Sequence, residues 1–172
     1  MNKLISRNII RAGFLLVIQL ILLRRINLTF GDFNYIHLSI YPLIIALLPY
    51  KLSRSLVILA AFLIGLSVDV FYNSLGVHAG TCVLVAFLRH YILMIIAPTD
   101  GYKDDSLTSY KYGVGWSLTY LAIFLLVHQF TLYSLEAFSP IYIKEIVLRT
   151  IFSFIASLFL IMIGLLIFNP KY

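Results

Sequence analysis

Long apolar stretches, separated by short polar breaks, run along nearly the whole chain. A helix needs about 20 apolar residues to cross a hydrocarbon core roughly 30 Å thick, and several stretches approach this length. The pattern predicts one transmembrane domain over residues 1–172 and an all-α integral membrane protein. Six transmembrane helices are expected, at 12–23, 36–50, 56–72, 77–97, 114–133 and 146–168.

The first two of these spans are irregular. The strictly uncharged core of the first is short, about 18 Å at 1.5 Å per residue, so the flanking Arg11 and Arg24 must snorkel or face protein. A small-x-small cleavage site is missing after its basic start, which favours an uncleaved helix over a signal peptide. Pro42 and Pro49 predict that the second span is kinked or broken, because proline removes a backbone donor.

Composition excludes a soluble protein. Hydrophobic residues make up 62% of the 172 residues and charged residues only 12%, far from the values of soluble domains. The net charge of +6 comes from Lys and Arg scattered at the ends of spans, so no nucleic-acid partner is expected. The single Cys82 can build neither a disulfide framework nor a cysteine metal site.

The positive charges predict the orientation, because cytoplasmic loops are enriched in Lys and Arg. With both termini in the cytoplasm, four of these residues face outward, namely Arg24, Arg25, Lys144 and Arg149. Nine then face the cytoplasm, namely Lys3, Arg7, Arg11, Lys51, Arg54, Arg89, Lys103, Lys111 and Lys171. We therefore expect the N-terminus and the C-terminus to be cytoplasmic.

A polar motif interrupts the apolar pattern between residues 65 and 80. Its members are Gly65, Asp69, Asn73, Gly76, His78 and Gly80. Gly65 shares a helical face with Asp69, and Gly76 with Gly80 forms a GxxxG pair typical of helix contacts. A tightly closed hairpin with a structural or partner-docking role is favoured over transport or catalysis. The partner of Asp69 is left open between His78, Arg149 and a residue of another protein.

The predicted topology places ionisable residues of four spans at one depth, an outer polar cluster. They are Asp69, His78, His128, Glu136 and Arg149. A charge at mid-bilayer costs about 2.5–3.5 kcal/mol on insertion scales, which makes a proton or solute relay one interpretation. Ion pairs that fix helix packing are the other.

Two further features concern the helix faces. Ser153, Ser157 and Gly164 give the sixth span a stripe of small residues, which indicates helix packing. Arg89 lies in the inner half of the fourth span, where it reaches the headgroups or binds an acidic group of another chain.

Motifs of known enzyme classes are missing from the sequence: there is no HExxH, GxSxG or phosphate-binding loop. The pair Asp104 and Asp105 follows Lys103 in a polar loop. We expect no enzyme activity, no cofactor and no metal; an enzyme acting on a lipid-linked substrate remains the weakest alternative.

The chain resembles the MreD family of rod shape-determining proteins, in the form found in Bacteroidetes. The resemblance covers nearly the full length, and its most specific part is Gly65-x-x-x-Asp69 followed by Leu75-Gly76-x-His78-Ala79. Further matches are Asn8-Ile9-Ile10-Arg11, Pro42, Leu47-Leu48-Pro49, Asn73 and Ala86-Phe87-Leu88-Arg89. His90 departs from the pattern, because similar sequences carry proline there.

The resemblance implies a scaffold of the cell-elongation complex in the bacterial inner membrane, without catalysis. Its expected partners are the membrane helix of MreC and, beyond it, MreB, a SEDS glycosyltransferase and a class B penicillin-binding transpeptidase. The family is similar in architecture to the S components of energy-coupling-factor transporters. An S-component-like bundle that binds or transports a solute is therefore the alternative.

Overall fold

Four long helices dominate the computed structural model, which describes residues 2–26, 28–30, 33–102, 107 and 112–167. They are α3 (Arg54–Tyr72), α4 (Val77–Ile95), α6 (Val114–Ala137) and α7 (Ile143–Ile167). All four are long and apolar enough to cross a membrane, α7 together with the 3₁₀ turn that precedes it. They overlap the predicted spans 56–72, 77–97, 114–133 and 146–168, and they are compatible with a multi-pass membrane protein.

The remaining elements are shorter. A continuous helical stretch opens the chain and consists of α1 (Asn2–Val17), the π-helical turn η1 (Ile18–Leu22) and the 3₁₀ turn η2 (Leu23–Arg25). It is followed by the strands β1 (Leu28–Phe30) and β2 (Phe33–Ile36) and by the short helix α2 (Pro42–Ala46). The 3₁₀ turn η3 (Pro140–Tyr142) directly precedes α7. The strands pair antiparallel, with Leu28 opposite Ile36. A short hairpin thus lies between the first two predicted spans and includes Ile36, the first residue of the second.

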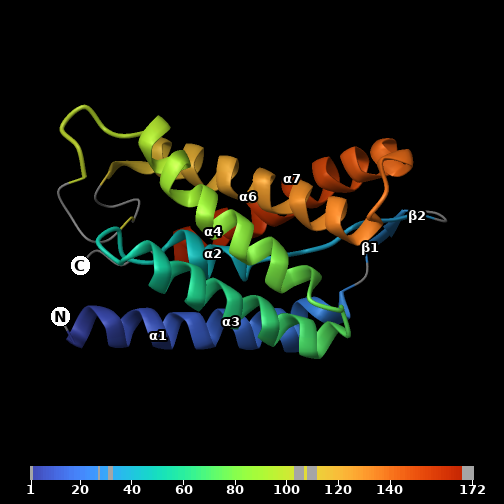
Figure 1. Ribbon diagram of the computed structural model, residues 1–172, viewed down its shortest axis with the longest axis horizontal. Helices are drawn as coiled ribbons and strands as arrows, with labels where there is room; N and C mark the ends of the chain where they lie inside the picture. Colours follow the sequence, from blue (N-terminus) through green and yellow to red (C-terminus); the bar gives the residue numbers. More distant parts are fainter. Residues whose placement is uncertain (1, 27, 31–32, 103–106, 108–111, 168–172) are drawn as a thin grey trace.

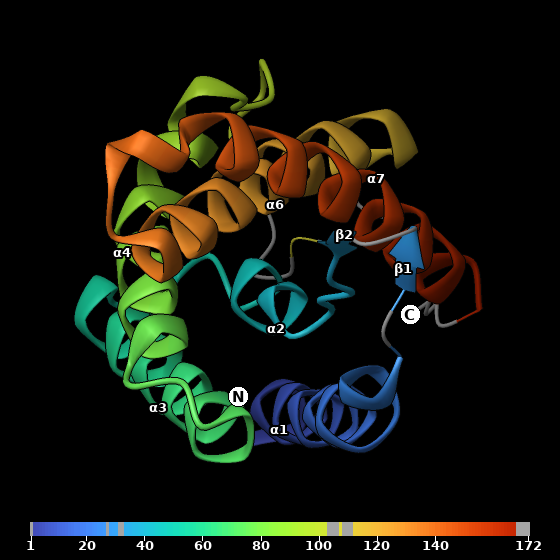
Figure 2. The ribbon, with the colours of Figure 1, turned by 90° about the vertical axis from the view of Figure 1, so that its right-hand side faces the viewer.

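The helices form a ring around α2. Figure 1 shows α3, α4, α6 and α7 running along the bundle, and Figure 2, viewed along it, shows α2 inside a ring made by α1, α3, α4, α6 and α7. All five residues of α2 are buried, and α2 contacts α1, α3, α4 and α6. The chain between β2 and α3 therefore passes through the core of the bundle.

The predicted second span differs from the observed structure. Residues 37–40 are not helical, and only Pro42–Ala46 forms an α-helix. Pro42 does not kink this helix but begins it, at a position where its missing N–H has no helical partner to lose. The first span, 12–23, is helical but is not among the four apolar helices, so the predicted count of six transmembrane helices is not confirmed.

Glycine allows α3 and α4 to pack at backbone contact distance. A Cβ added at Gly65 would lie 2.6 Å from the Cα of Ala79 and 2.7 Å from the carbonyl oxygen of His78. Asn73 then ends α3 in the left-handed conformation, and Gly76, with φ +86°, begins α4. Glycine tolerates this backbone at no steric cost, so the hairpin predicted from the sequence is formed with a minimal turn.

Aromatic residues close the opposite end of α4. The Trp116 indole donates to the carbonyl of Ile96 at 2.8 Å, and the Tyr102 hydroxyl donates to Leu93 at 2.7 Å. Burial raises the pKa of Tyr102 to about 12, so the hydroxyl keeps the proton that it donates. Both hydrogen bonds satisfy carbonyls that the end of α4 leaves unpaired.

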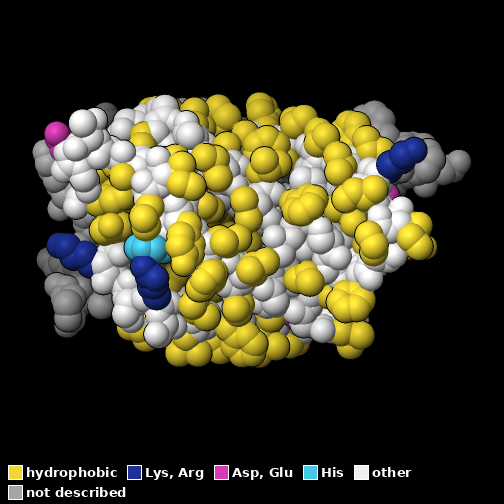
Figure 3. Space-filling model, turned by 45° about the horizontal axis from the view of Figure 1, so that its top comes forward, with side chains coloured by type: hydrophobic (Ala, Val, Ile, Leu, Met, Phe, Trp, Pro, Cys, Tyr) yellow, Lys and Arg dark blue, Asp and Glu magenta, His cyan; other side chains and the backbone are white. Residues whose placement is uncertain are grey.

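The outer surface of the ring is apolar. Hydrophobic side chains cover the face seen in Figure 3, whereas the Lys and Arg side chains visible there lie toward the ends of the bundle. Large exposed side chains on α3 and α4 include Leu59, Phe62, Leu63, Leu84 and Phe87. Such a surface is what a lipid environment requires.

Replacement of Gly65 by Ala tests the close contact. We expect Gly65→Ala to lower the free energy of unfolding by about 1–3 kcal/mol, the typical cost of overpacking, because backbone atoms rather than flexible side chains oppose the new methyl group. Gly80→Ala is the control, since its Cβ would lie 3.6 Å from Leu135. Unfolding in micelles measures both, and equal stabilities would contradict the observed packing.

Candidate functional site

The Asp69 carboxylate caps the N-terminus of α4. One oxygen, Oδ1, accepts a hydrogen bond from the backbone N–H of His78 at 3.0 Å, and Oδ2 accepts one from that of Ala79 at 2.8 Å. The residue at the N-cap position is Gly76, which has no side chain to offer. An anion from the preceding helix replaces the usual capping residue and complements the positive end of the helix dipole.

Two side chains complete this cap. The Ser74 hydroxyl donates to Oδ1 of Asp69 at 2.6 Å and lies 2.7 Å from Nδ1 of His78. The same nitrogen lies 3.1 Å from Oδ1 of Asp69. Asp69 and His78 are both buried, at 6% and 7% exposure. The question left open by the sequence is thus answered within the hairpin: Asp69 meets His78 and not Arg149.

The GxxxG pair does not make the contact between α3 and α4. Both Gly76 and Gly80 are exposed, and Gly65 packs against Ala79 instead. Gly76 serves the turn, and Gly80 leaves a small exposed position on α4. The interpretation of the motif as a closed hairpin agrees with this geometry, whereas its role in docking a partner stays a prediction.

A second polar network holds the non-helical residues 37–40 inside the bundle. From α7, the Ser153 hydroxyl accepts from the backbone N–H of His37 at 2.9 Å, and Ser157 accepts from that of Ser39 at 3.0 Å. Backbone groups in a membrane need such partners when they leave a helix. Both serines are fully buried, so the predicted packing stripe binds the core segment of its own chain.

Gln19 binds the other side of the same segment. Its amide donates to the carbonyl of Leu38 at 3.1 Å and accepts from the N–H of Ile40 at 2.8 Å. Alternate residues thus pair with opposite neighbours, which is the pattern of an extended chain. Gln19 lies in the π-helical turn η1 and is fully buried; such turns are common at specialised sites.

Arg89 caps the end of α2. Its guanidinium donates to the carbonyl of Leu48 and, at 3.2 Å, to the Tyr120 hydroxyl, which in turn donates to Ala46 at 2.8 Å. Arg11 donates to Leu47 at 3.1 Å. Arg89 is only 4% exposed. Its donors are therefore used within the bundle, where they satisfy groups at a helix end that has no helical partners.

His128 lies apart from the Asp69 cap. It is fully buried, and within the described part of the chain neither ring nitrogen has a hydrogen-bond partner. The ring of Tyr41 contacts both histidines edge-on, with its centroid 5.1 Å from that of His128 and 5.9 Å from that of His78. Within the predicted outer polar cluster, Asp69 and His78 thus lie within hydrogen-bond distance of each other, whereas His128 contacts the ring of Tyr41.

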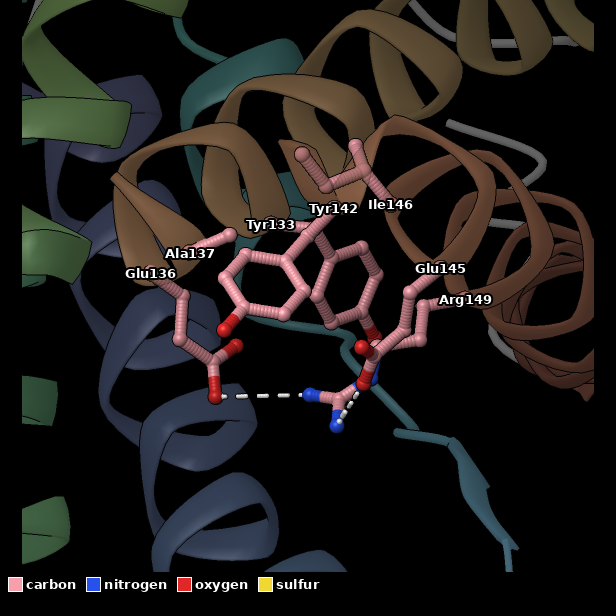
Figure 4. Close-up of a pocket in the computed structure, with 7 residues that line it drawn as sticks. All are labelled: Tyr133, Glu136, Ala137, Tyr142, Glu145, Ile146 and Arg149. Carbon is pink, nitrogen blue, oxygen red and sulfur yellow. Dashed lines mark ion pairs between the residues drawn. The ribbon is translucent and has the colours of Figure 1, made fainter. Parts of the chain in front are cut away.

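Glu136 and Arg149 form a third group, at the junction of α6 and α7. Arg149 lies 3.6 Å from Glu136 and 2.7 Å from Glu145. A pocket of about 200 Å³ surrounds them (Figure 4), lined by Tyr133, Glu136, Ala137, Tyr142, Glu145, Ile146 and Arg149. None of Asp69, His78 and His128 lines this pocket. Gly164 belongs to α7, but its surroundings lie outside the described residues.

Sequence reasoning missed several residues of these networks. They are nearly or fully buried polar residues that the sequence pattern did not distinguish from the apolar spans around them, namely Gln19, Ser39, Tyr41 and Tyr120. A single polar side chain within such a span was the available signal, since an uncompensated polar group in lipid is costly.

Comparison of the chain with protein-family models, curated proteins and solved structures finds no match.

Graded replacement of Asp69 tests the cap. Asp69→Leu leaves the N–H groups of His78 and Ala79 without their acceptors, so we expect a loss of about 2–4 kcal/mol in the free energy of unfolding. Asp69→Asn keeps one acceptor and should lose roughly half as much. Unfolding in micelles gives both values, with Asp100→Asn at an exposed loop position as control; a wild-type value for Asp69→Leu would refute the capping role.

Proposed function

We propose that the protein is a non-catalytic scaffold of the bacterial cell-elongation complex, of the MreD type, which binds the membrane helix of MreC. The supporting observation is the use made of the residues that carry the resemblance. Gly65, Asp69, Asn73 and Gly76 close one hairpin, and Arg89 holds the end of α2. Side chains that fix the arrangement of the helices in this way suit a protein that acts by presenting a surface of defined shape to its partners in the membrane.

The proposed arrangement has six passes through the bacterial inner membrane. The stretch from α1 to η2 is the first pass. The stretch from β2 to Tyr50, which includes α2, is the second. Both termini lie in the cytoplasm, because this orientation places the larger number of Lys and Arg on the cytoplasmic side. Through MreC the scaffold would link MreB to a SEDS glycosyltransferase and a class B penicillin-binding transpeptidase.

The alternative is a solute-binding membrane subunit similar to an S component. The broken second pass favours it, since interrupted membrane segments often line binding sites in transporters. Tyr41 weakens it, because this fully buried ring packs against both His78 and His128, two of the groups that would line a shared cavity.

Co-purification of MreC from native membranes tests the scaffold function. We expect MreC to remain with the wild-type chain and with Gly115→Leu, an exposed glycine whose surroundings are open. Gly80→Leu should reduce the retained MreC about tenfold, because a large side chain on α4 would keep a partner helix from approaching closely.

Two outcomes would count against this account. Absence of MreC from the wild-type preparation, with normal rods after deletion of the gene, would remove the scaffold function. Undiminished binding by Gly80→Leu would remove only the docking role of Gly80.

A further inference from the structure

The pocket between α6 and α7 combines charges of both signs. Figure 4 shows the Arg149 guanidinium between the carboxylates of Glu136 and Glu145, beneath the rings of Tyr133 and Tyr142. Its volume of about 200 Å³ is many times the roughly 10–15 Å³ that a single water molecule needs. The space is therefore suited to a polar group of several heavy atoms.

The ion pairs leave part of this charge unmatched. Two carboxylates share one guanidinium, and Glu136 holds the longer contact, 3.6 Å, with 55% of its side chain exposed. The Nη1 of Arg149 makes this same contact, which is longer than an ordinary hydrogen bond, and 30% of the Arg149 side chain is exposed. The pocket thus offers a carboxylate and a guanidinium N–H that are only weakly paired with each other, which together suit a ligand that carries both a cation and an anionic oxygen.

The position of the pocket is that of a membrane headgroup region. α6 has 24 residues and is about 36 Å long, which exceeds a hydrocarbon core of roughly 30 Å. Its last turn and the first turns of α7 form the pocket. Beside it, Phe138 and Ile141 are 89% and 85% exposed, so apolar surface borders the charges as it does at a lipid interface.

We propose that this pocket binds the headgroup of a phospholipid that carries a primary ammonium and a phosphate. The ammonium pairs with Glu136 and Glu145, and a phosphate oxygen accepts from Arg149 Nη1. Carboxylates form strong charge-assisted hydrogen bonds with N–H donors. A primary ammonium has such donors, whereas a quaternary ammonium has none. The pocket therefore prefers ethanolamine to choline headgroups. This site is separate from the scaffold function and requires only that the protein is embedded in a membrane.

Titration of the delipidated protein in micelles with phosphatidylethanolamine and with phosphatidylcholine tests the site. We expect the wild type to bind the ethanolamine lipid about tenfold more tightly, the effect of one strong hydrogen-bonded contact. Glu136→Gln should abolish most of this preference, because it removes the carboxylate with the weaker internal pairing. Asp100→Asn, an exposed acid-to-amide change away from the pocket, should preserve the preference.

Arg149→Lys separates the two halves of the site. This variant keeps a positive charge between the carboxylates but loses the planar guanidinium and its Nη1 donor, so binding of both lipids should weaken while their ratio stays high. Since Glu136→Gln changes the ratio and Arg149→Lys changes the common affinity, a general loss of folding cannot imitate both results.

Equal binding of the two lipids by the wild type would overturn the proposal, as would a preference that Glu136→Gln leaves intact. Equal lipid binding combined with loss of a co-purifying protein in Glu136→Gln would also overturn it, and would assign the pocket to a basic side chain of a polypeptide.

Discussion

The fold depends on satisfying backbone polar groups where the chain leaves helical geometry inside the helical bundle. Residues 37–40 have no helical partners, and lipid supplies neither donors nor acceptors. Gln19 meets them from one side, and Ser153 with Ser157 from the other. These contacts explain why fully buried polar residues occur in helices that are otherwise apolar. They also connect η1 and α7 through residues 37–40, which bind both.

The free backbone groups at the end of α2 and at the start of α4 also need hydrogen-bond partners. The carbonyls that follow α2 are met by Arg11 and Arg89, and the free N–H groups of α4 are met by Asp69. Each charged side chain is held by helix-end dipoles, whose partial charges have the opposite sign. An ionisable residue in a membrane segment is a functional candidate by default, but here two of the most conspicuous ones, Asp69 and Arg89, serve the architecture. The headgroup pocket proposed at Glu136 and Arg149 uses a different set of charges.

Local patterns predicted the parts of the fold that depend on neighbouring residues. The lengths of the apolar stretches predicted the helices α3, α4, α6 and α7, and the spacing of Gly65 and Asp69 indicated a closed hairpin. Contacts between distant residues were beyond such patterns, since Ser157 lies 118 positions from Ser39. The stripe of small residues was interpreted as helix packing, whereas the structure shows Ser153 and Ser157 bound to backbone N–H groups of His37 and Ser39. The sequence did not indicate these bonds, because hydroxyls that bind backbone and small residues that admit a helix look alike in sequence.

Backbone amide hydrogen exchange in micelles tests whether side chains hold residues 37–40 in place. We expect slow exchange for His37, Ser39 and Ile40, comparable to the middle of α4, because a side chain accepts from each of their N–H groups. In Gln19→Leu, Ile40 should become the fastest of the three, since its acceptor is removed while Ser153 and Ser157 remain. Fast exchange of all three amides in the wild type, or equal acceleration of all three in the variant, would contradict a core segment held by these specific side chains.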